Sequence, residues 1–536
     1  MGIARRATVA GLAVLLAVAG CTPGGSDPLP TPPQLTSNAT LVTNAQDPAT
    51  LRDGGQLRIP VTRLPASWNP WAADATSDTD EMVDAVRPHY LVYDAAGDAR
   101  PNPDFATAAS ATHDGRTVVT LDLNPKAVWG DGRQITADDW VASWRALSGR
   151  VPGVRAQASD WRRVADVRAG EGPLQVVLTF ASVDPDWSRV LEHGPLPADG
   201  VKDAAAFNAS WASPDSARWA GPLRIAHVDR LQGVVTLERN PRWWGARPRL
   251  DSVIFRTIQP EALPAAFSSN EFDLFDVGLS ESALTLARST DGVTVRANLG
   301  ATARRLTLKE DDGPLQELPV RQAIVRAIDR DRLTRTVLED AGGEGAVWSN
   351  HLLLTNQAGY TNQADATGLT YAPDQAERLL QDAGWVLGGT NGSIRAKNGR
   401  PLSLTLTADP GDAQAAAEAS RITADLTAVG VQVRPVSGGG DLSVERVTLS
   451  RYPLEDAAAS LTHSDSEKDL ARRIADEPDP IARNALATQA AAQLWQQADT
   501  IPLYQEPQVV AVKNGLANVG ADALASTSWT AIGWTR

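Results

Sequence analysis

Short runs of β-branched and aromatic residues, bounded by Gly, Pro, Asn or Asp, mark the first half of the chain. Such runs predict strands, and they fall at Val118–Leu123, Leu174–Phe180, Val234–Leu237 and Val253–Ile258. In the second half the period changes, because apolar residues recur at helical spacing in Val320–Ile328 and Ala376–Ala383. The pattern therefore predicts a mixed α/β body whose first half is rich in strands.

One segment of the second half predicts a strand, a helix and a second strand in succession. Leu402–Thr407 and Val431–Val436 have the strand pattern, and the Ala-rich stretch Asp412–Val429 between them is typical of a helix. A βαβ unit of this kind implies parallel strands and a right-handed crossover.

The first residues have the pattern of an export signal. Arg5 and Arg6 precede the apolar run Ala7–Ala19, which is shorter than the about 20 residues that a membrane-spanning helix needs. Leu16–Cys21 also resembles the bacterial lipobox, in which the cysteine is lipidated and becomes the first residue. We expect a lipoprotein signal peptide at 1–20 and lipid attachment at Cys21, so that the protein is extracytoplasmic and anchored to the cell membrane. An ordinary secretory signal is the alternative.

The stretch that follows this signal lacks apolar periodicity. Residues 21–53 are rich in Pro, Gly, Ser, Thr and Asn, and such a composition buries too little apolar surface to order itself. We expect a flexible linker here, with the folded body beginning near Gly54.

Composition narrows the class of protein. A chain of 536 residues with 43% hydrophobic and 21% charged residues is long enough for at least two globular domains. The net charge of −14 argues against a nucleic-acid partner, because binding to phosphates needs basic surface. The single cysteine excludes a disulfide within the chain and a thiolate metal cluster.

The sequence lacks the common motifs of catalytic sites. The sequence contains no G-x-S-x-G, no H-E-x-x-H and no Gly-Lys pair, and its six histidines are scattered. We therefore expect no catalytic residues, no cofactor and no metal. A metal site that histidine and carboxylates form only in three dimensions stays open.

One sequence block and seven further motifs carry a resemblance to a known family. Trp129–Trp140, which reads WGDGRQITADDW, follows a strand pattern and predicts a turn and then a helix that begins at Thr136. This block resembles the family 5 extracellular solute-binding proteins, the peptide and nickel binders of ABC importers. Further matches follow in the family's order at Gly54–Leu57, Asn102–Ala106, Gly221–Ile225, Leu237–Ile258, Val320–Leu333, Tyr371–Trp385 and Ile501–Pro507.

The resemblance implies an α/β, two-lobed clamshell of the periplasmic-binding-protein type with an extra strand-rich subdomain. Lobe I would comprise residues 54–301, with the extra subdomain at about 82–213. Lobe II would comprise residues 302–499, and residues 500–536 would return to lobe I. The basic residues are mostly arginine, as in proteins of GC-rich genomes, which favours an actinobacterial type.

The resemblance also implies a function. The protein would be the substrate-binding protein of an ABC transporter and would capture a solute, most simply an oligopeptide, between its lobes for import. Its partners would be permease and ATPase subunits on separate chains, and the family default is a monomer. Closure follows from ligand contacts that exist only in the closed state.

Aromatic residues after the first strand are the candidates for the ligand-binding wall. The predicted ligand-binding residues are Trp68, Asn69, Trp71, Trp348 and Asn350, with core packing as the competing interpretation of each tryptophan. Peptide-binding family members hold the ligand's amino terminus with an aspartate-rich segment, but Glu445–Asp456 lacks that motif. Asp441, Glu455 or Asp456 could substitute.

A second function stays open because of this altered segment. Envelope lipoproteins of the same fold, which are not transport receptors, are implicated as scaffolds or regulators in the assembly of cell-wall lipoglycan. An exported enzyme is the third possibility.

Overall fold

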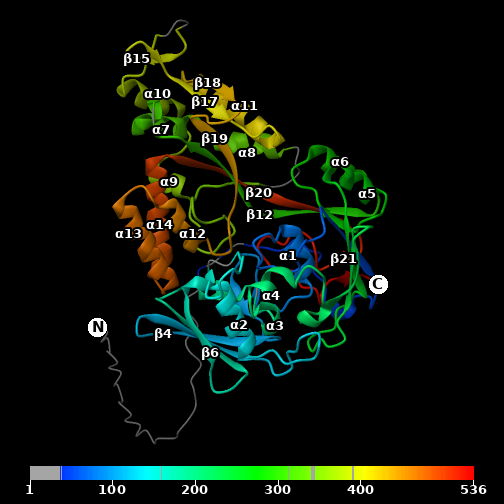
Figure 1. Ribbon diagram of the computed structural model, residues 1–536. Helices are drawn as coiled ribbons and strands as arrows, with labels where there is room; N and C mark the ends of the chain where they lie inside the picture. Colours follow the sequence, from blue (N-terminus) through cyan, green and yellow to red (C-terminus); the bar gives the residue numbers. More distant parts are fainter. Residues whose placement is uncertain are drawn as a thin grey trace, which may run out of the picture.

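The computed structural model describes residues 35, 37, 39–157, 160–192, 194–311, 313–339, 345–388 and 392–536 (Figure 1). The predicted signal peptide at 1–20 and the lipid attachment at Cys21 lie outside these residues. Among the described residues, we find no helix with both the length and the apolarity needed to cross a membrane.

A four-stranded sheet forms the base of the first lobe. Its order is β1 (Gln56–Val61), β10 (Ser252–Thr257), β9 (Val234–Arg239) and β8 (Leu223–Asp229). β1 pairs in parallel with β10, with Leu57 opposite Val253, whereas the other pairs are antiparallel. Side chains of β1 alternate between buried and less buried positions, so one face of the sheet packs into the core.

The strand-rich segment predicted at about 82–213 contains a second sheet. Its antiparallel strands are β4 (Ala106–His113), β5 (Arg116–Leu123), β7 (Gln175–Phe180) and β6 (Val164–Ala169). Asp114 and Gly115 join β4 to β5 with φ angles of 49° and 72°, values that a tight hairpin turn requires. Helix α2 (Ala137–Leu147) follows Thr136, as predicted.

Two long strands run through the middle of the molecule (Figure 1). β12 (Val293–Leu308) and β20 (Thr500–Lys513) pair along most of their length. The 16 residues of β12 span about 50 Å at about 3.3 Å per residue. The same sheet contains β11 (Leu274–Asp276), β19 (Leu442–Thr448), β17 (Ser403–Thr407), β18 (Gln432–Val436) and the short β13 (Ala346–Val347).

Both long strands contribute to two separate cores. The buried cluster of the second lobe includes Leu306 of β12 and Tyr504 of β20. At the other end of the two strands, Val510 of β20 belongs to the first-lobe cluster, and Val293 of β12 packs against a smaller cluster that contains Phe275. The register of the β12–β20 pair shifts between Leu299 and Ala303. This irregularity lies where the sequence predicts the boundary between the lobes, and the exact domain bounds stay a prediction.

The second lobe confirms the predicted βαβ unit. β17 and β18 pair in parallel, and α11 (Ala413–Ala428) connects them. The two predicted amphipathic helices are α7 (Leu318–Ala327) and α10 (Pro373–Asp382). Three further helices form a cluster with its own core, namely α12 (Pro453–Ser460), α13 (Asp465–Asp476) and α14 (Pro480–Gln497).

Shorter elements complete the described fold. The helices are α1 (Ser77–Asp84), α3 (Ala198–Val201), α4 (Ala204–Ala209), α5 (Leu263–Ser268), α6 (Glu281–Ser289), α8 (Arg330–Leu338) and α9 (Gln363–Thr367). The strands are β2 (Leu91–Tyr93), β3 (Ala99–Pro101), β14 (Val386–Leu387), β15 (Arg395–Lys397), β16 (Arg400–Pro401), β21 (Leu516–Ala517) and β22 (Gly533–Trp534).

The folded body begins earlier than the predicted end of the linker at residue 53. The N–H of Val42 donates to the carbonyl of Ala521 at 3.2 Å, and a 3₁₀ turn forms at Pro48–Thr50. Leu51 is 1% exposed. The residues from Val42 onward therefore contact the folded body despite their polar composition, and the bounds of the linker stay a prediction.

Candidate functional site

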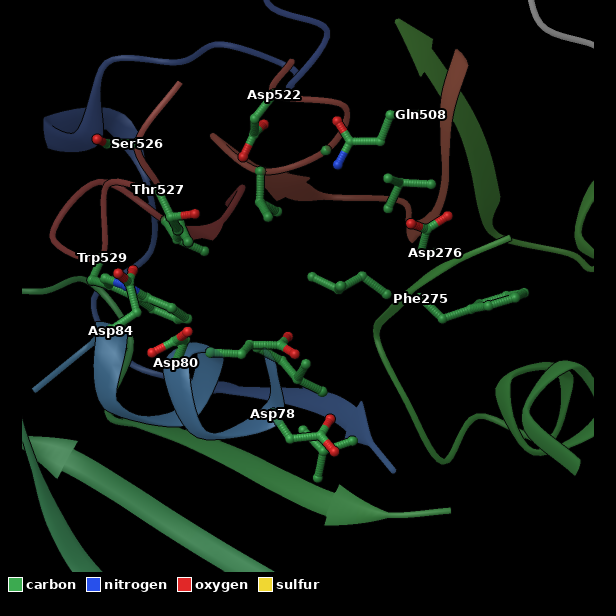
Figure 2. Close-up of a pocket in the computed structure, with 18 of the residues that line it drawn as sticks. Asp78, Asp80, Asp84, Phe275, Asp276, Gln508, Asp522, Ser526, Thr527 and Trp529 are labelled. Atoms are coloured by element: carbon green, nitrogen blue, oxygen red, sulfur yellow. The ribbon is translucent and has the colours of Figure 1, made fainter. Parts of the chain in front are cut away.

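A cavity of about 620 Å³ lies in the first lobe, beside the long strands. Its walls are β1, α1, the residues around β11, part of β20 and the C-terminal segment 519–532. Figure 2 shows Asp80 and Asp84 on α1 on one side of this space, Asp522 on the C-terminal segment on another, and Asp276 on a third. The size is within the range of small-molecule and peptide sites.

Helix α1 brings a row of carboxylates to the cavity. Met82 and Val83 are fully buried in the lobe I core and fix the helix against the sheet. The other face of the same helix then presents Asp78, Asp80, Glu81 and Asp84 to the cavity.

Two of these four carboxylates already have partners within the protein. Asp78 accepts the backbone N–H groups of Thr62 at 3.2 Å and of Arg63 at 3.1 Å, so it joins α1 to the end of β1. Asp84 pairs with Arg87 at 2.9 Å and accepts the indole N–H of Trp529 at 2.7 Å. These two groups stabilise the wall of the cavity.

Four other carboxylates in the cavity have no cationic partner at ion-pair distance. Asp80 and Glu81 form no side-chain hydrogen bond or ion pair with any residue that the structure describes. Asp276 accepts the N–H of Gly278 at 2.8 Å, and Oδ1 of Asp522 is buried without a partner among the described residues. The site therefore carries uncompensated negative charge.

The pKa values of these groups are consistent with this interpretation. The cavity walls remove part of the hydration of Glu81 and, together with the nearby carboxylates of Asp78, Asp84 and Asp276, raise its pKa to about 7. Burial raises the pKa of Asp522 to about 6, against the lowering effect of Arg296. Burial also raises the pKa values of Asp80 and Asp276. A cation in the cavity would reverse these shifts, because it favours the ionised carboxylates.

The two arginines of the cavity are paired with other carboxylates of its wall. Arg87 pairs with Asp84, and Arg451 pairs with Glu192 at 3.1 Å while its guanidinium lies 4.4 Å from the ring centre of Tyr93. Burial lowers the pKa of His89 despite the attraction of Asp84, which favours its neutral form. None of the three compensates Asp80 or Glu81 at ion-pair distance.

Apolar side chains form the rest of the wall. Phe275, Val510, Trp529 and Ile532 all line the cavity and are nearly buried. An apolar surface beside a charged end suits a ligand with one cationic group and a hydrophobic body.

The predicted residues after β1 lie in the core of the first lobe and do not line this cavity. Trp68 and Asn69 are 0% exposed, and Asn69 binds the carbonyl of Phe207 and the N–H of Trp71. Trp71 packs edge-on against Trp161 at 6.4 Å. It borders an adjoining hollow of about 540 Å³ that shares Asp80 and Glu192 with the cavity. The structure thus favours core packing for Trp68 and Asn69.

Trp348 and Asn350 lie in the second lobe, where they also have structural partners. The indole N–H of Trp348 donates to the carbonyl of Leu353 at 2.8 Å. Asn350 accepts the N–H groups of Leu352 and Leu353 and so holds a turn. Trp348 borders a small hollow of about 190 Å³, and neither residue lines the large cavity.

The three possible substitutes for the missing aspartate-rich segment are engaged in other contacts. Glu455 pairs with Arg163 and with Arg189, each at 3.1 Å, and Asp456 pairs with Arg189 at 3.2 Å. Asp441 accepts the N–H of Thr405 at 2.7 Å. None of them lines the large cavity.

Sequence reasoning missed the carboxylates of the cavity. One signal was available, because residues 77–84 read SDTDEMVD and combine four acids with two core residues on a short helix that follows β1. Asp276 and Asp522 come from distant parts of the chain. Asp276 ends β11, which pairs with β20, and Asp522 lies in the segment that follows β20.

A family model and a similar protein both assign the chain to the same family. Residues 100–454 match the bacterial extracellular solute-binding proteins of family 5. The oligopeptide-binding protein OppA of Mycobacterium tuberculosis is 31% identical over 98% of this chain and 93% of its own length.

Two further proteins are similar to this chain at lower sequence identity. LpqW of M. tuberculosis, described as a probable monoacyl phosphatidylinositol tetramannoside-binding protein, is 26% identical over 58% of this chain and 48% of its own length. The solved structure of the periplasmic EDTA-binding protein EppA superposes with a TM-score of 0.80 at 22% identity, over 93% of this chain and 99% of EppA. This structural likeness confirms the expected two-lobed α/β fold.

Proposed function

The chain belongs to the bacterial extracellular solute-binding proteins of family 5, and on that premise we propose that it captures an oligopeptide in the cavity beside α1. The family consists of binding proteins, so we propose no catalytic role. The similarity to OppA over nearly the whole chain supports a peptide as the solute.

One observation carries this proposal, namely the four carboxylates of the cavity that lack a cationic partner. Asp80, Glu81, Asp276 and Asp522 surround a space that is also lined by Phe275 and Trp529. A peptide's ammonium group would supply the missing positive charge, while its side chains would contact the apolar wall. Glu455 and Asp456 are ion-paired with arginines, so we place recognition of the amino terminus in the first lobe.

Contacts between the extra subdomain and the helical cluster support a closed arrangement of the lobes. Arg163 and Arg189 reach Glu455 and Asp456 on α12, and Arg483 on α14 pairs with Asp186. The hydroxyls of Tyr93 and Tyr452 lie 2.9 Å apart. Arg451, which lies in the predicted second lobe, also lines the cavity. We propose that a ligand in the cavity contacts both lobes and so favours this closed form, and that the permease and ATPase subunits, on separate chains, receive the solute from it.

The proposed position of the protein in the cell rests on the pattern of its first residues and on the names of its relatives. We propose that Cys21 carries the lipid anchor and that the protein works as a monomer outside the cytoplasmic membrane. The lipoprotein names of several relatives, such as the uncharacterized lipoprotein Rv2585c of M. tuberculosis, support this placement.

A second candidate function is that of a scaffold or regulator in the assembly of envelope lipoglycan. The similarity to LpqW favours it. A phosphatidylinositol glycolipid carries a phosphate, however, and the unpaired carboxylates of the cavity would repel that group. The charge of the site therefore favours the peptide.

Binding experiments with matched peptides test the proposal. A pentapeptide library screened by native mass spectrometry identifies a binder, and calorimetry then compares this peptide with its N-acetylated form. We expect acetylation to weaken binding about 10- to 100-fold, because a charge-assisted hydrogen bond contributes about 1.5–3 kcal/mol. Asp80→Asn should remove much of this difference, whereas Glu171→Gln, which changes an exposed carboxylate outside the cavity, should preserve it. Equal affinity for both peptides would contradict the proposed site.

A further inference from the structure

A second cluster of ligating side chains lies in the other lobe, away from the acidic cavity. Glu310 follows β12, His463 precedes α13 and Asp499 immediately precedes β20. One ligand atom from each of these three residues lies within 4.8 Å of the other two. We propose that Glu310, His463 and Asp499 bind a divalent transition-metal ion, with zinc as the best match.

Two of the three distances between the ligand atoms match those around a tetrahedral metal ion, and the third is within 4.8 Å. Nε2 of His463 lies 3.4 Å from Oε1 of Glu310 and 3.5 Å from Oδ2 of Asp499. Zinc binds histidine nitrogen and carboxylate oxygen at about 2.0–2.2 Å, and two ligands of a tetrahedron with such bonds are about 3.4 Å apart. A small adjustment of side chains would therefore place one ion between the three atoms.

Each carboxylate is held through one oxygen and leaves the other for the ion. Oε2 of Glu310 pairs with Arg321 at 3.3 Å, so Oε1 is the oxygen that faces His463. Oδ1 of Asp499 accepts the hydroxyl of Thr500 at 3.4 Å, while Oδ2 faces His463. This preorganisation lowers the cost of bringing the three ligands together.

A third carboxylate, that of Glu467, lies on the other side of the imidazole. Oε2 of Glu467 lies 3.6 Å from Nδ1 of His463 and accepts the backbone N–H of the same residue at 2.9 Å. The side chain of Glu467 is 0% exposed, so its position is fixed by the fold. A carboxylate beside the second ring nitrogen is the usual companion of a metal-bound histidine, because it fixes the tautomer that directs Nε2 to the ion.

The surroundings leave room for a further ligand. His463 and Asp499 border the hollow of about 190 Å³ that also contains His351. Nδ1 of His351 is buried without a hydrogen-bond partner among the described residues, and burial lowers the pKa of His351 to about 4. A neutral imidazole and space for water beside the cluster suit a zinc ion with three protein ligands.

Zinc at this position would connect the second-lobe ends of both long strands. Glu310 lies just beyond the end of β12, Asp499 lies just before β20, and His463 joins them to the helical cluster. A bound ion would therefore stabilise the second lobe. This inference is independent of the solute that the first lobe binds.

Titration with zinc chloride tests the site. The purified protein is passed over a chelating resin and titrated by calorimetry in a buffer that does not bind metals, and its melting temperature is measured with and without zinc. The site variants are His463→Gln and Asp499→Asn. The control is His113→Gln, because Nε2 of His113 lies 3.5 Å from Oδ2 of Asp114 but both side chains are at least 79% exposed.

We expect one equivalent of zinc to bind and to raise the melting temperature of the unaltered protein and of His113→Gln. Each site variant should lose at least about tenfold in affinity for that equivalent and most of the rise in melting temperature, while its melting temperature without zinc changes little. Absence of saturable binding would overturn the proposal. Binding that persists unchanged in both site variants would also overturn it, because other residues would then hold the ion.

Discussion

The affinity for a cationic peptide should depend steeply on pH, because the carboxylates of the cavity must be ionised to bind an ammonium group. The pKa of Glu81 is raised to about 7 in the free protein, so this carboxyl is about half protonated at pH 7 and almost fully protonated at pH 5. A bound cation favours the ionised form. Binding at pH 5 must therefore displace the proton of Glu81, and the affinity falls as the pH falls.

The size of the effect follows from the pKa values. For Glu81 alone, the protonated population predicts that the dissociation constant rises about 50-fold between pH 7 and pH 5. Asp522, with a pKa of about 6, raises the dissociation constant by a further factor of about ten over the same interval. The peptide contributes little to this change, because its α-amino group has a pKa of about 7.7–8.0 and stays mostly protonated over this range.

Calorimetric titration at pH 5, 6 and 7 measures the effect, with Glu81→Gln as the decisive variant. Its side chain cannot ionise, so the variant should bind weakly at pH 7 and show only the remaining dependence of about tenfold. At pH 5 its affinity should approach that of the unaltered protein, because protonated Glu81 is then as uncharged as the glutamine side chain of the variant. Glu171→Gln is the matched control and should keep the full dependence. The reasoning would be refuted if Glu81→Gln kept the full dependence or if binding tightened as the pH fell.

Three other outcomes are expected. Trp68→Ala should lower the free energy of unfolding by about 3–5 kcal/mol in urea melts, because Trp68 is 0% exposed in the core. The peptide affinity should stay within about twofold. A large loss of affinity with unchanged stability would instead assign Trp68 to the ligand-binding wall. Glu418→Gln should cost about 3 kcal/mol of stability, because it removes the charge of a fully buried carboxylate that pairs with Arg304 at 2.7 Å. A loss below about 1 kcal/mol would contradict this. Cys21→Ala should release the protein from the membrane fraction, since lipid chains contribute about 0.8 kcal/mol for each buried methylene; continued membrane association by immunoblot would exclude the tether.

Local structure was largely predictable from the sequence. The strand near Val118 and the helices near Val320 and Ala376 have strong periodic patterns, and the structure contains β5, α7 and α10 at these places. The turn at Asp114 and Gly115 and the helix start at Thr136 were predictable for the same reason, because turns and helix caps depend on neighbouring residues.

The candidate site could not be predicted from local patterns. Trp68 and Trp71 suit a ligand wall and a core equally well, because an indole is both large and apolar, and only the packing against Trp161 places Trp71 among buried aromatics. The acids on α1 have the composition of a solvated helix start. Their role depends on Asp276 and Asp522, which long-range strand pairing brings to the same cavity.

The central claim is that the acidic cavity of the first lobe holds the cationic end of a peptide, and a crystal structure of the protein with its tightest-binding peptide tests it most directly. We predict that the ammonium group lies within hydrogen-bond distance of Asp80 or Glu81, with the next side chains against Phe275 and Trp529. A peptide amino terminus held by Glu455 or Asp456, or a peptide bound outside this cavity, would contradict the claim.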